Sequence, residues 1–384
     1  MIHTSHIELS ESAVKNNIDF IHNQLDKNVT FSSVVKGNAY GHSIEYYCPL
    51  AYKYGIRHFS VFSAEEAFKV KKALPTNDYT LLIMGYIENE EINWAIENGI
   101  HFYVFERDRL DATVEMAKKT GTKANIHIEL ETGMNRTGFQ LEIIDSILAN
   151  VEKNIKYLNI EGICTHLAGA EDLSNYHRIT AQTKLFEATQ NRIKKISWMQ
   201  PKWHIASSSA TLRYPNTQLD IARIGILQYG FFPTKEVFAH YLEKNKKNKN
   251  SLQRIITWKT RVMDIKTVKK GAYVGYGTSF LTNRVTKIAM LPIGYSSGYS
   301  RSLSNKGTVL IKGKRLNVIG NINMSMMVVD ITNIEGVEKG EEVVLIGNQK
   351  DTEITVSSFS DFNQQINYEL LTRLPQEIPK IITK

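Results

Sequence analysis

Two hydrophobic periods alternate along the first 230 residues of the chain. Apolar residues three or four positions apart, such as Val14, Ile18 and Ile21, predict amphipathic helices. Short continuous apolar runs predict buried strands. Eight such runs lie at residues 31–35, 58–62, 79–84, 100–105, 124–130, 160–165, 203–206 and 220–224. Amphipathic stretches separate most of them, for example 92–98, 110–119, 141–151 and 176–196.

These eight strand–helix repeats predict an α/β fold, with an N-terminal (β/α)8 barrel of the TIM type. An open doubly wound sheet is the alternative. In a barrel, the chemistry is carried by the loops at the carboxyl ends of the strands. The residues that follow each apolar run are therefore the first candidates for a functional site.

The pattern changes after residue 250. Short β-branched and apolar runs alternate with glycine-containing turns, at 261–265, 287–291, 308–312, 316–319, 326–331 and 342–346. This pattern predicts a mostly antiparallel β domain, with a helix of any length only at 359–371. We therefore assign residues 1–238 to the barrel, 239–252 to a linker rich in Lys and Asn, and 253–384 to the β domain.

The composition is that of a globular protein with a large core: 384 residues, 42% hydrophobic and 22% charged. No apolar run approaches the ~18 residues of a membrane span, and residues 1–10 lack the pattern of an export signal. Two cysteines, Cys48 and Cys164, exclude a disulfide framework and a four-cysteine zinc site. We expect a cytoplasmic protein with neither a metal nor a membrane partner.

The formal charge of +8 is concentrated in one stretch. The chain has 47 Lys and Arg against 39 Asp and Glu, and residues 243–249 carry much of the excess. No aromatic residues are interleaved there, as a nucleic-acid surface would require. We therefore interpret this stretch as a solvated linker and expect no nucleic-acid partner.

A lysine ends the first predicted barrel strand, in the segment VVKGNAYGH at 34–42. Lysine is rarely buried without a partner, and desolvation of Lys36 would lower its pKa and free the amine for covalent chemistry. From this segment alone, a lysine that extends to solvent is an equally good interpretation. If a helical turn follows, Tyr40 lies on the same side, placed to bind a phosphate or to pack.

The segment 34–42 is similar to the pyridoxal-phosphate attachment segment of the alanine racemase family. Six later segments resemble further motifs of that family in the same order: 132–138 (TGMNRTG), 165–168 (THLA), 222–226 (ARIGI), 274–277 (VGYG), 292–295 (PIGY) and 367–369 (NYE). The resemblance implies a barrel followed by a β domain, and a homodimer with shared active sites. It also implies a small amino acid as substrate, with D-alanine made for the cell wall.

The resemblance implies that Lys36 holds pyridoxal phosphate covalently and acts as a base on one face of the substrate. Racemisation needs a second acid or base on the opposite face, because one group cannot serve both sides. The resemblance assigns this role to Tyr276 of the neighbouring subunit. A tyrosine base needs neighbours that stabilise its anion, and His166 is the family's histidine. Outside the motifs, a core histidine and a packed aromatic are the alternatives for these two residues.

Arg223 matches the family's partner of the pyridine nitrogen. An arginine does not give up its proton, so the nitrogen stays unprotonated and the ring is a weaker electron sink. The carbanion is then less delocalised, which favours simple reprotonation over transamination. A surface ion pair for this arginine fits poorly with its apolar neighbours, Ala222 and Ile224.

The remaining residues of the resemblance would bind the phosphate and the substrate. The phosphate contacts are Tyr40, Ser208, the backbone of Gly225 and Ile226, and Tyr368. A serine that begins a helix is also a common N-cap, so Ser208 alone has a structural alternative. The substrate carboxylate would meet Arg136 and the backbone N–H of Met324, and Tyr295 and Arg301 would line the entrance.

Several positions depart from the family pattern. Where the family often has a lysine that becomes carbamylated, this chain has Glu129, and we hypothesise that its carboxylate supplies the same negative charge beside Arg136. Other departures include Ser207, Asn321, Asn323 and Ser325, which by the resemblance would lie around the substrate and its entrance. The reaction is thus better supported than the substrate: alanine leads, and serine or a broader range of amino acids is the alternative.

Three other classes of protein compete with a racemase. A fold-type III amino-acid decarboxylase predicts an acidic partner for the pyridine and a cysteine in the segment donated by the second subunit. Arg223 and the lack of cysteine after Cys164 argue against it. A non-enzymatic cofactor carrier of this barrel type has no β domain. A nucleic-acid binder needs aromatic residues near a basic face, and its binding would depend strongly on salt. The Lys/Asn-rich linker does not support this class.

Overall fold

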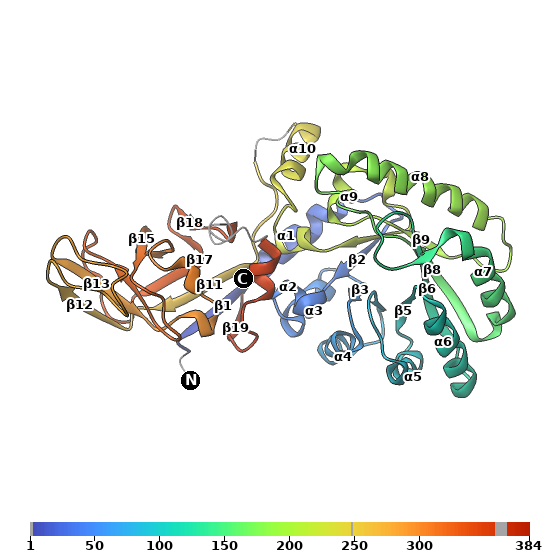
Figure 1. Ribbon diagram of the computed structural model, residues 1–384, viewed down its shortest axis with the longest axis horizontal. Coiled ribbons are helices and arrows are strands. Elements are labelled where there is room, and N and C mark those ends of the chain that lie inside the picture. The colour runs from blue at the N-terminus through green and yellow to red at the C-terminus, as the bar shows by residue number, and fades with distance from the viewer. Residues whose placement is uncertain (1–2, 247–248, 358–366) are drawn as a thin grey trace. The chain divides into compact units, whose positions relative to one another are not determined.

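The computed structural model describes residues 3–246, 249–357 and 367–384, without the side chains of 367 and 368. It consists of two compact units. We call them the barrel unit, Ala13–Ala39 with Tyr47–Gln253, and the β unit, Met1–Ser12 with Tyr40–Tyr46 and Arg254–Lys384. Figure 1 shows the elements of both.

Eight parallel strands form the barrel: β2 (Thr30–Val34), β3 (His58–Val61), β4 (Thr80–Ile83), β5 (His101–Val104), β6 (Ala124–Glu131), β8 (Leu158–Cys164), β9 (Lys202–His204) and β10 (Ile221–Ile224). They are hydrogen-bonded in the order β10-β2-β3-β4-β5-β6-β8-β9, and a parallel bridge between Ser207 and Arg223 joins the ends. Short β7 (Phe139–Gln140) pairs with β6. The predicted barrel is confirmed, because each predicted run overlaps one of these strands.

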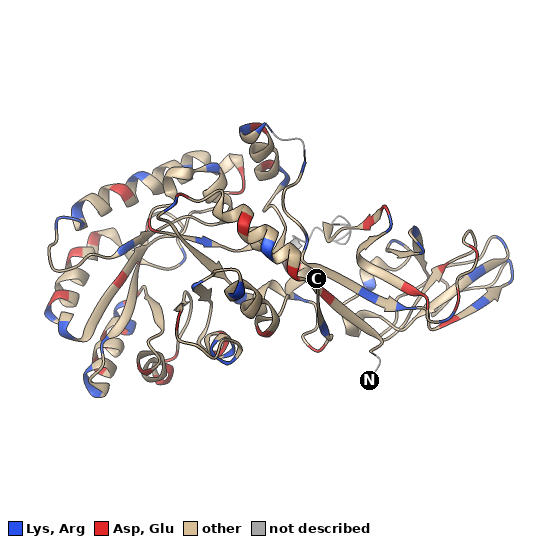
Figure 2. Ribbon diagram, turned by 180° about the vertical axis from the view of Figure 1, so that it is seen from behind, with Lys and Arg blue, Asp and Glu red and all other residues tan. Residues whose placement is uncertain are grey.

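Helices cover the outside of the barrel (Figure 1). They are α1 (Glu11–His22), α3 (Ile44–Lys53), α4 (Ala64–Ala73), α5 (Asn89–Glu97), α6 (Arg107–Thr120), α7 (Ile144–Lys153), α8 (Tyr176–Ile193), α9 (Ser208–Arg213) and α10 (Lys235–Asn245). An amphipathic helix buries one apolar stripe, which in α7 consists of Ile144, Ile147, Leu148 and Val151. Figure 2 shows acidic and basic residues interspersed along α6 and α8. None of the helices within the described ranges is long and apolar enough to cross a membrane.

A buried amide fixes the seam between β2 and β10. Gln228 Nε2 donates to the carbonyl oxygens of Val34 (2.8 Å) and Ile224 (3.0 Å), the last residues of the two strands. Its Oε1 accepts from Ser33 Oγ (2.7 Å) and Tyr47 OH (3.0 Å). All polar atoms of this side chain are thus paired, which makes the seam rigid where two loops of the candidate site begin.

The β unit contains a mostly antiparallel sheet, as predicted. Its strands are β1 (Ser5–Ser10), β11 (Ile256–Arg261), β12 (Asp264–Val268), β13 (Thr286–Leu291), β14 (Thr308–Ile311), β15 (Lys314–Ile319), β16 (Met327–Asp330), β17 (Glu342–Gln349), β18 (Thr352–Ile354) and β19 (Lys380–Thr383). The order is β12-β13-β16-β15-β14-β17-β11-β1-β19, with β18 on β17. The N-terminal strand β1, which the hydrophobic pattern did not predict, pairs antiparallel with β11 and parallel with β19.

The structure corrects the strand predicted at 261–265. This segment is not one strand, because β11 ends and β12 begins within it. Val262 N–H donates to the Glu341 carbonyl, whereas Met263 N–H donates to the Met290 carbonyl. The apolar run continues across this change of partner strand. Helix α10 extends through Asn245 into the Lys/Asn-rich stretch. Helix α12 (Asn367–Thr372) overlaps the helix predicted at 359–371, and the rest of that prediction lies outside the described residues.

Candidate active site

Lys36 follows β2 at the carboxyl end of the barrel. Its side chain is exposed, and its amine has no hydrogen bond or ion pair within the described parts of the chain. The protein atoms that displace water around the amine are the main cause of a lowered pKa. Arg136 and Arg223 lower the pKa further, and Glu66 opposes them. Lys36 therefore carries a more reactive, more easily neutralised amine than a surface lysine.

A left-handed turn comes directly after Lys36. Gly37, Asn38, Ala39 and Tyr40 all have positive φ, between 51° and 63°. The helical turn expected here exists, but its hand is reversed, which costs roughly 1–2 kcal/mol per non-glycine residue. Glu66 on α4 holds its start, since Glu66 Oε1 accepts from the N–H groups of Gly37 (2.6 Å) and Asn38 (3.2 Å). The sequence gives no sign of this role for Glu66.

Arg223 on β10 is held by five acceptors. Its Nη1 donates to the carbonyl of His204 (2.9 Å) and lies 2.6 Å from His204 Nδ1. Its Nη2 donates to the carbonyl of Thr165 (2.9 Å), with longer contacts to the Ile205 carbonyl (3.4 Å) and to His166 Nδ1 (3.5 Å). No acceptor within the described residues meets Nε–H. One donor of a buried guanidinium therefore remains available to another molecule.

His166 follows β8 and is uncharged in this setting. Burial is the main cause that lowers its pKa to about 3, and Arg223, Arg136 and Lys36 contribute. A neutral imidazole offers one donor and one acceptor. Any help that His166 gives to a tyrosine base must therefore come from a hydrogen bond and not from a positive charge.

Two of the predicted phosphate contacts meet in the structure. Ser208 Oγ accepts from Gly225 N–H at 2.9 Å, and both residues are near the carboxyl ends of β9 and β10. The N-cap of α9 is Ser207, whose Oγ accepts from Ala210 N–H. Ser208 is therefore not the N-cap of α9, and its contact with a phosphate stays a prediction. Ile226 is buried beside them, and the pKa of Tyr40 is raised to about 12 by burial, so its hydroxyl keeps its proton.

Two buried glutamates support the loop that carries Arg136. Glu131 accepts hydrogen bonds from the N–H groups of Gly133 and Arg136. Burial alone would raise the pKa of Glu131, but four backbone N–H groups outweigh it and lower the pKa. Glu129 has the opposite shift: burial raises its pKa, although Thr137, Arg223 and Arg136 each favour the charged form. Sequence analysis singled out Glu129 and missed Glu131.

The predicted residues of the β unit are open to solvent. Tyr276 is 73% exposed, Met324 60% and Tyr295 41%, and Arg301 is also exposed. Tyr276 lies between Gly275 (φ 77°) and Gly277 (φ 70°). Its carbonyl accepts from Asn321 Nδ2 at 2.8 Å, so one departure from the family pattern holds this turn. The side chain of Tyr368 lies outside the described part of the chain.

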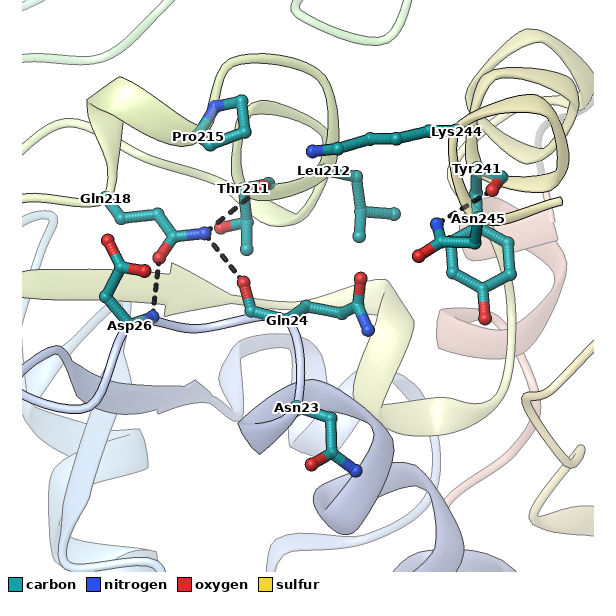
Figure 3. A pocket seen from close by; sticks show the side chains of 10 residues that line it. All are labelled: Asn23, Gln24, Asp26, Thr211, Leu212, Pro215, Gln218, Tyr241, Lys244 and Asn245. Atoms are coloured by element: carbon teal, nitrogen blue, oxygen red, sulfur yellow. Dashed lines mark hydrogen bonds between the residues drawn. The ribbon is translucent and has the colours of Figure 1, made fainter.

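A separate hollow of about 210 Å³ lies elsewhere on the barrel unit (Figure 3). Its lining comes from the loop between α1 and β2, from α9 and the segment between α9 and β10, and from α10. The Gln218 amide, bonded to Asp26 N–H and to the carbonyls of Gln24 and Thr211, fills part of it. These loops precede β2 and β10, so the hollow belongs to the end of the barrel opposite Lys36.

Fold and residues together define a class: a closed parallel barrel with a reactive lysine at a strand end, joined to a β unit. The models of the alanine racemase N-terminal and C-terminal domains match residues 9–233 and 255–382. The chain is 34% identical to an alanine racemase of Leptospira interrogans, over 99% of this chain and 96% of that one. The protein belongs to the alanine racemase family, and the resemblance seen in its motifs is confirmed.

Solved structures agree with this assignment. The alanine racemase of Clostridium difficile 630 matches with a TM-score of 0.90 and 26% identity, over 100% of this chain and 96% of that one. The alanine racemase of Bartonella henselae, solved with covalently bound pyridoxal phosphate, matches with a TM-score of 0.85 and 25% identity over the whole of both chains. Both likenesses extend over the barrel unit and the β unit.

Proposed function

We propose that this protein is a pyridoxal-phosphate-dependent racemase that interconverts L- and D-alanine with two catalytic bases. The observation that carries the proposal is that two groups lie at the same end of the barrel. They are the amine of Lys36, with its lowered pKa, and Arg223, with its available Nε–H. The cytoplasm is the proposed location, because Cys48 and Cys164 are buried free thiols. D-alanine for the cell wall is the proposed use of the product.

The residues present fit pyridoxal phosphate. Lys36 would hold it covalently, and the Nε–H of Arg223 suits the lone pair of an unprotonated pyridine nitrogen. Tyr40, Ser208, the backbone of Gly225 and Ile226, and Tyr368 would hold the phosphate. When bound, the cofactor supplies an electron sink that makes the α-proton of the substrate acidic. Arg223 limits that sink, which favours return of the proton over transamination.

Two groups on opposite faces then move the proton. Lys36 serves one face, and its lowered pKa makes the neutral amine more accessible than that of an ordinary lysine. Tyr276 of a second copy of the chain would serve the other face. The exposure of Tyr276 and Met324 supports this arrangement, because a large aromatic side chain that is mostly open to solvent suits an interface. We therefore propose a homodimer with shared active sites.

The substrate carboxylate would bind Arg136 and the backbone N–H of Met324, and Tyr295 and Arg301 would line the entrance. Glu129, near Arg136 and Arg223, would supply the negative charge that orients Arg136. Alanine is the proposed substrate because the relatives and solved structures named above are alanine racemases. The departures at Ser207, Asn321, Asn323 and Ser325 keep serine and a broader range of amino acids in the experimental panel.

Isotope exchange tests this proposal directly. The purified protein is incubated in D₂O with pyridoxal phosphate and each of a panel of L-amino acids. Deuterium at the α-carbon and the appearance of the D-enantiomer are followed together. We expect both for alanine. Release of CO₂ without inversion would assign a decarboxylase, and a bound cofactor with no exchange for any amino acid would leave a cofactor carrier.

A further inference from the structure

A line of three histidines lies inside the barrel and ends on Arg223. His101 is the first residue of β5, His127 lies within β6, and His204 is the last residue of β9. His101 Nδ1 is 3.1 Å from His127 Nε2, and His127 Nδ1 is 2.9 Å from His204 Nε2. His204 Nδ1 is 2.6 Å from Arg223 Nη1. This histidine line, His101–His127–His204, connects the amino end of β5 with Arg223.

Arg223 sets the direction of every hydrogen bond in the histidine line. A guanidinium only donates, so His204 Nδ1 must accept and the proton of that ring is on Nε2. The Nε2–H of His204 then donates to His127 Nδ1, and by the same logic His127 Nε2–H donates to His101 Nδ1. We infer that His127 and His101 are positioning residues for Arg223, because each accepts the N–H of the next ring and so fixes its tautomer.

Gly162 on β8 makes the middle bond of the line possible. Strand β8 lies between β6 and β9 in the sheet. A Cβ atom on Gly162 would be 2.2 Å from His127 Nδ1 and 3.0 Å from His204 Nε2, the two atoms that share the hydrogen bond. Gly162 does not have a positive φ. Its lack of a side chain therefore serves the contact between the rings and not an unusual backbone.

The surroundings keep the histidine line uncharged. Burial lowers the pKa of both inner rings well below the ordinary value for histidine. Burial, followed by the nearby charge of Lys202, lowers the pKa of His101 to about 4. His58 on β3 and the ring of Tyr103 also face the line, and the pKa of His58 is lowered to about 3. Each ring therefore keeps one proton at neutral pH, as a line of directed donors requires.

The histidine line determines which N–H donor of Arg223 stays available to another molecule. With Nη1 on His204 and Nη2 on the Thr165 carbonyl, Nε–H remains for an external acceptor. If His204 took the other tautomer, its Nδ1–H would face Nη1–H and displace the guanidinium. The inference rests on the proposed function for the identity of that acceptor, the ring nitrogen. Arg223 does not bind the substrate carboxylate in that proposal, so the expected effect is on kcat and not on KM.

The hydrogen bonds themselves are measured on the full-length protein without added cofactor. With ¹⁵N-labelled histidine, each N–H···N bond gives a coupling between its two nitrogens, and the ¹⁵N shifts report the tautomer. We expect couplings between His101 and His127 and between His127 and His204, with both inner rings protonated on Nε2. Absence of these couplings, or a proton on Nδ1 of His204, would overturn the inference.

Four variants test the positioning role in the loaded enzyme. His101→Leu removes the terminal acceptor, whereas His101→Gln keeps one in its amide oxygen. Gly162→Ala separates two rings without changing either, and His58→Leu removes a buried imidazole beside the line. We expect His101→Leu and Gly162→Ala to lower kcat about fivefold at unchanged KM, the effect of one hydrogen bond. His101→Gln and His58→Leu should keep the wild-type kcat.

Two outcomes separate this inference from the proposed function. A wild-type kcat in His101→Leu, with the couplings present in the wild-type protein, would remove the positioning role. Couplings in a protein that racemises no amino acid would overturn the proposed function and still support the histidine line.

Discussion

Two candidate site residues of the barrel unit, Arg223 and Ser208, are hydrogen-bonded to the protein around them, whereas Tyr276, Met324 and Tyr295 of the β unit are open to solvent. Arg223 is held by carbonyl groups and a histidine, and Ser208 is bonded to Gly225. Tyr276, by contrast, is 73% exposed, and its hydroxyl has no hydrogen bond within the described residues. Its backbone carbonyl accepts from Asn321 Nδ2, and the glycines on either side of it adopt positive φ.

This difference suggests a division of labour. A preorganised group contributes most when its position costs no rearrangement during the reaction, which suits the part of the site that holds the cofactor. A tyrosine that is mostly exposed to solvent suits a group that completes the site of another subunit. The barrel unit would therefore bind the cofactor, and residues from two chains together would catalyse the racemisation.

Replacing the covalent anchor should have the largest effect. We expect Lys36→Ala to lower racemisation by about 10⁴-fold or more, because the base on one face and the covalent anchor are lost together. The control is Lys72→Ala, which removes an exposed lysine on α4. Racemisation is measured by chiral chromatography, and the attachment site by mass spectrometry after borohydride reduction. Attachment at another lysine would contradict the assignment of Lys36.

The exposed half of the site should matter almost as much. We expect Tyr276→Phe to lower racemisation by about 10²–10⁴-fold, because the acid or base of one face is lost. The variant should still bind the cofactor, since Tyr276 is not among its proposed contacts. α-Proton exchange in D₂O should fall much more for one enantiomer than for the other. An equal fall for both would show that Tyr276 does not serve a single face.

Mixing the two variants sharpens the comparison between the units. A heterodimer of one Lys36→Ala chain and one Tyr276→Phe chain contains one intact site if the site is shared, and none if it lies within a chain. We therefore expect heterodimers, purified through two different tags, to recover about half of the wild-type rate. Each homodimeric variant serves as the control. Failure to recover would overturn the shared site while leaving both residues catalytic.

Glu129 should affect substrate binding and stability in opposite directions. We expect Glu129→Gln to raise the KM for alanine about tenfold, a loss of about 1.4 kcal/mol, because Arg136 loses a negative neighbour. Burial raises the pKa of Glu129, so the native state binds its proton more tightly than the unfolded chain. The contribution of Glu129 to the free energy of unfolding therefore falls as the pH rises through its pKa in the native state.

The stability of the same variant follows from that sign. The Tm of Glu129→Gln should be higher than that of the wild type at neutral pH, by about 2–4 °C for each kcal/mol. The difference should shrink in acid, where the wild-type carboxyl is protonated. A lower Tm at neutral pH would show that the favourable charge interactions of Glu129 outweigh its burial. An unchanged KM would show that Glu129 does not act as the charged neighbour of Arg136.

The sequence was sufficient to predict the barrel, but not the residues that support the candidate site. Buried parallel strands leave continuous apolar runs, which any chain of this fold must display. The prediction missed β1, because Ile7 and Leu9 are the only aliphatic residues of this strand and form no continuous apolar run. It also missed Glu66 and Glu131, since an acidic residue on a helix or strand end does not reveal which N–H groups it will meet. Local sequence cannot show such long-range pairings.

The smallest expected effect concerns the turn after Lys36 in the barrel unit. A variant there can weaken the hydrogen bonds that support the site without removing a catalytic group. Glu66→Ala deletes the acceptor for Gly37 and Asn38 N–H, so the left-handed turn loses hydrogen bonds to a charged group. We expect a loss of about 2 kcal/mol in the free energy of unfolding, measured with urea, and a fall of a few-fold in kcat. Glu65→Ala is the matched control, because within the described residues that neighbour makes only an exposed i,i+4 ion pair with Lys69, and such pairs contribute little to stability. Equal stability of the two variants would mean that the turn after Lys36 keeps its shape without the hydrogen bonds to Glu66.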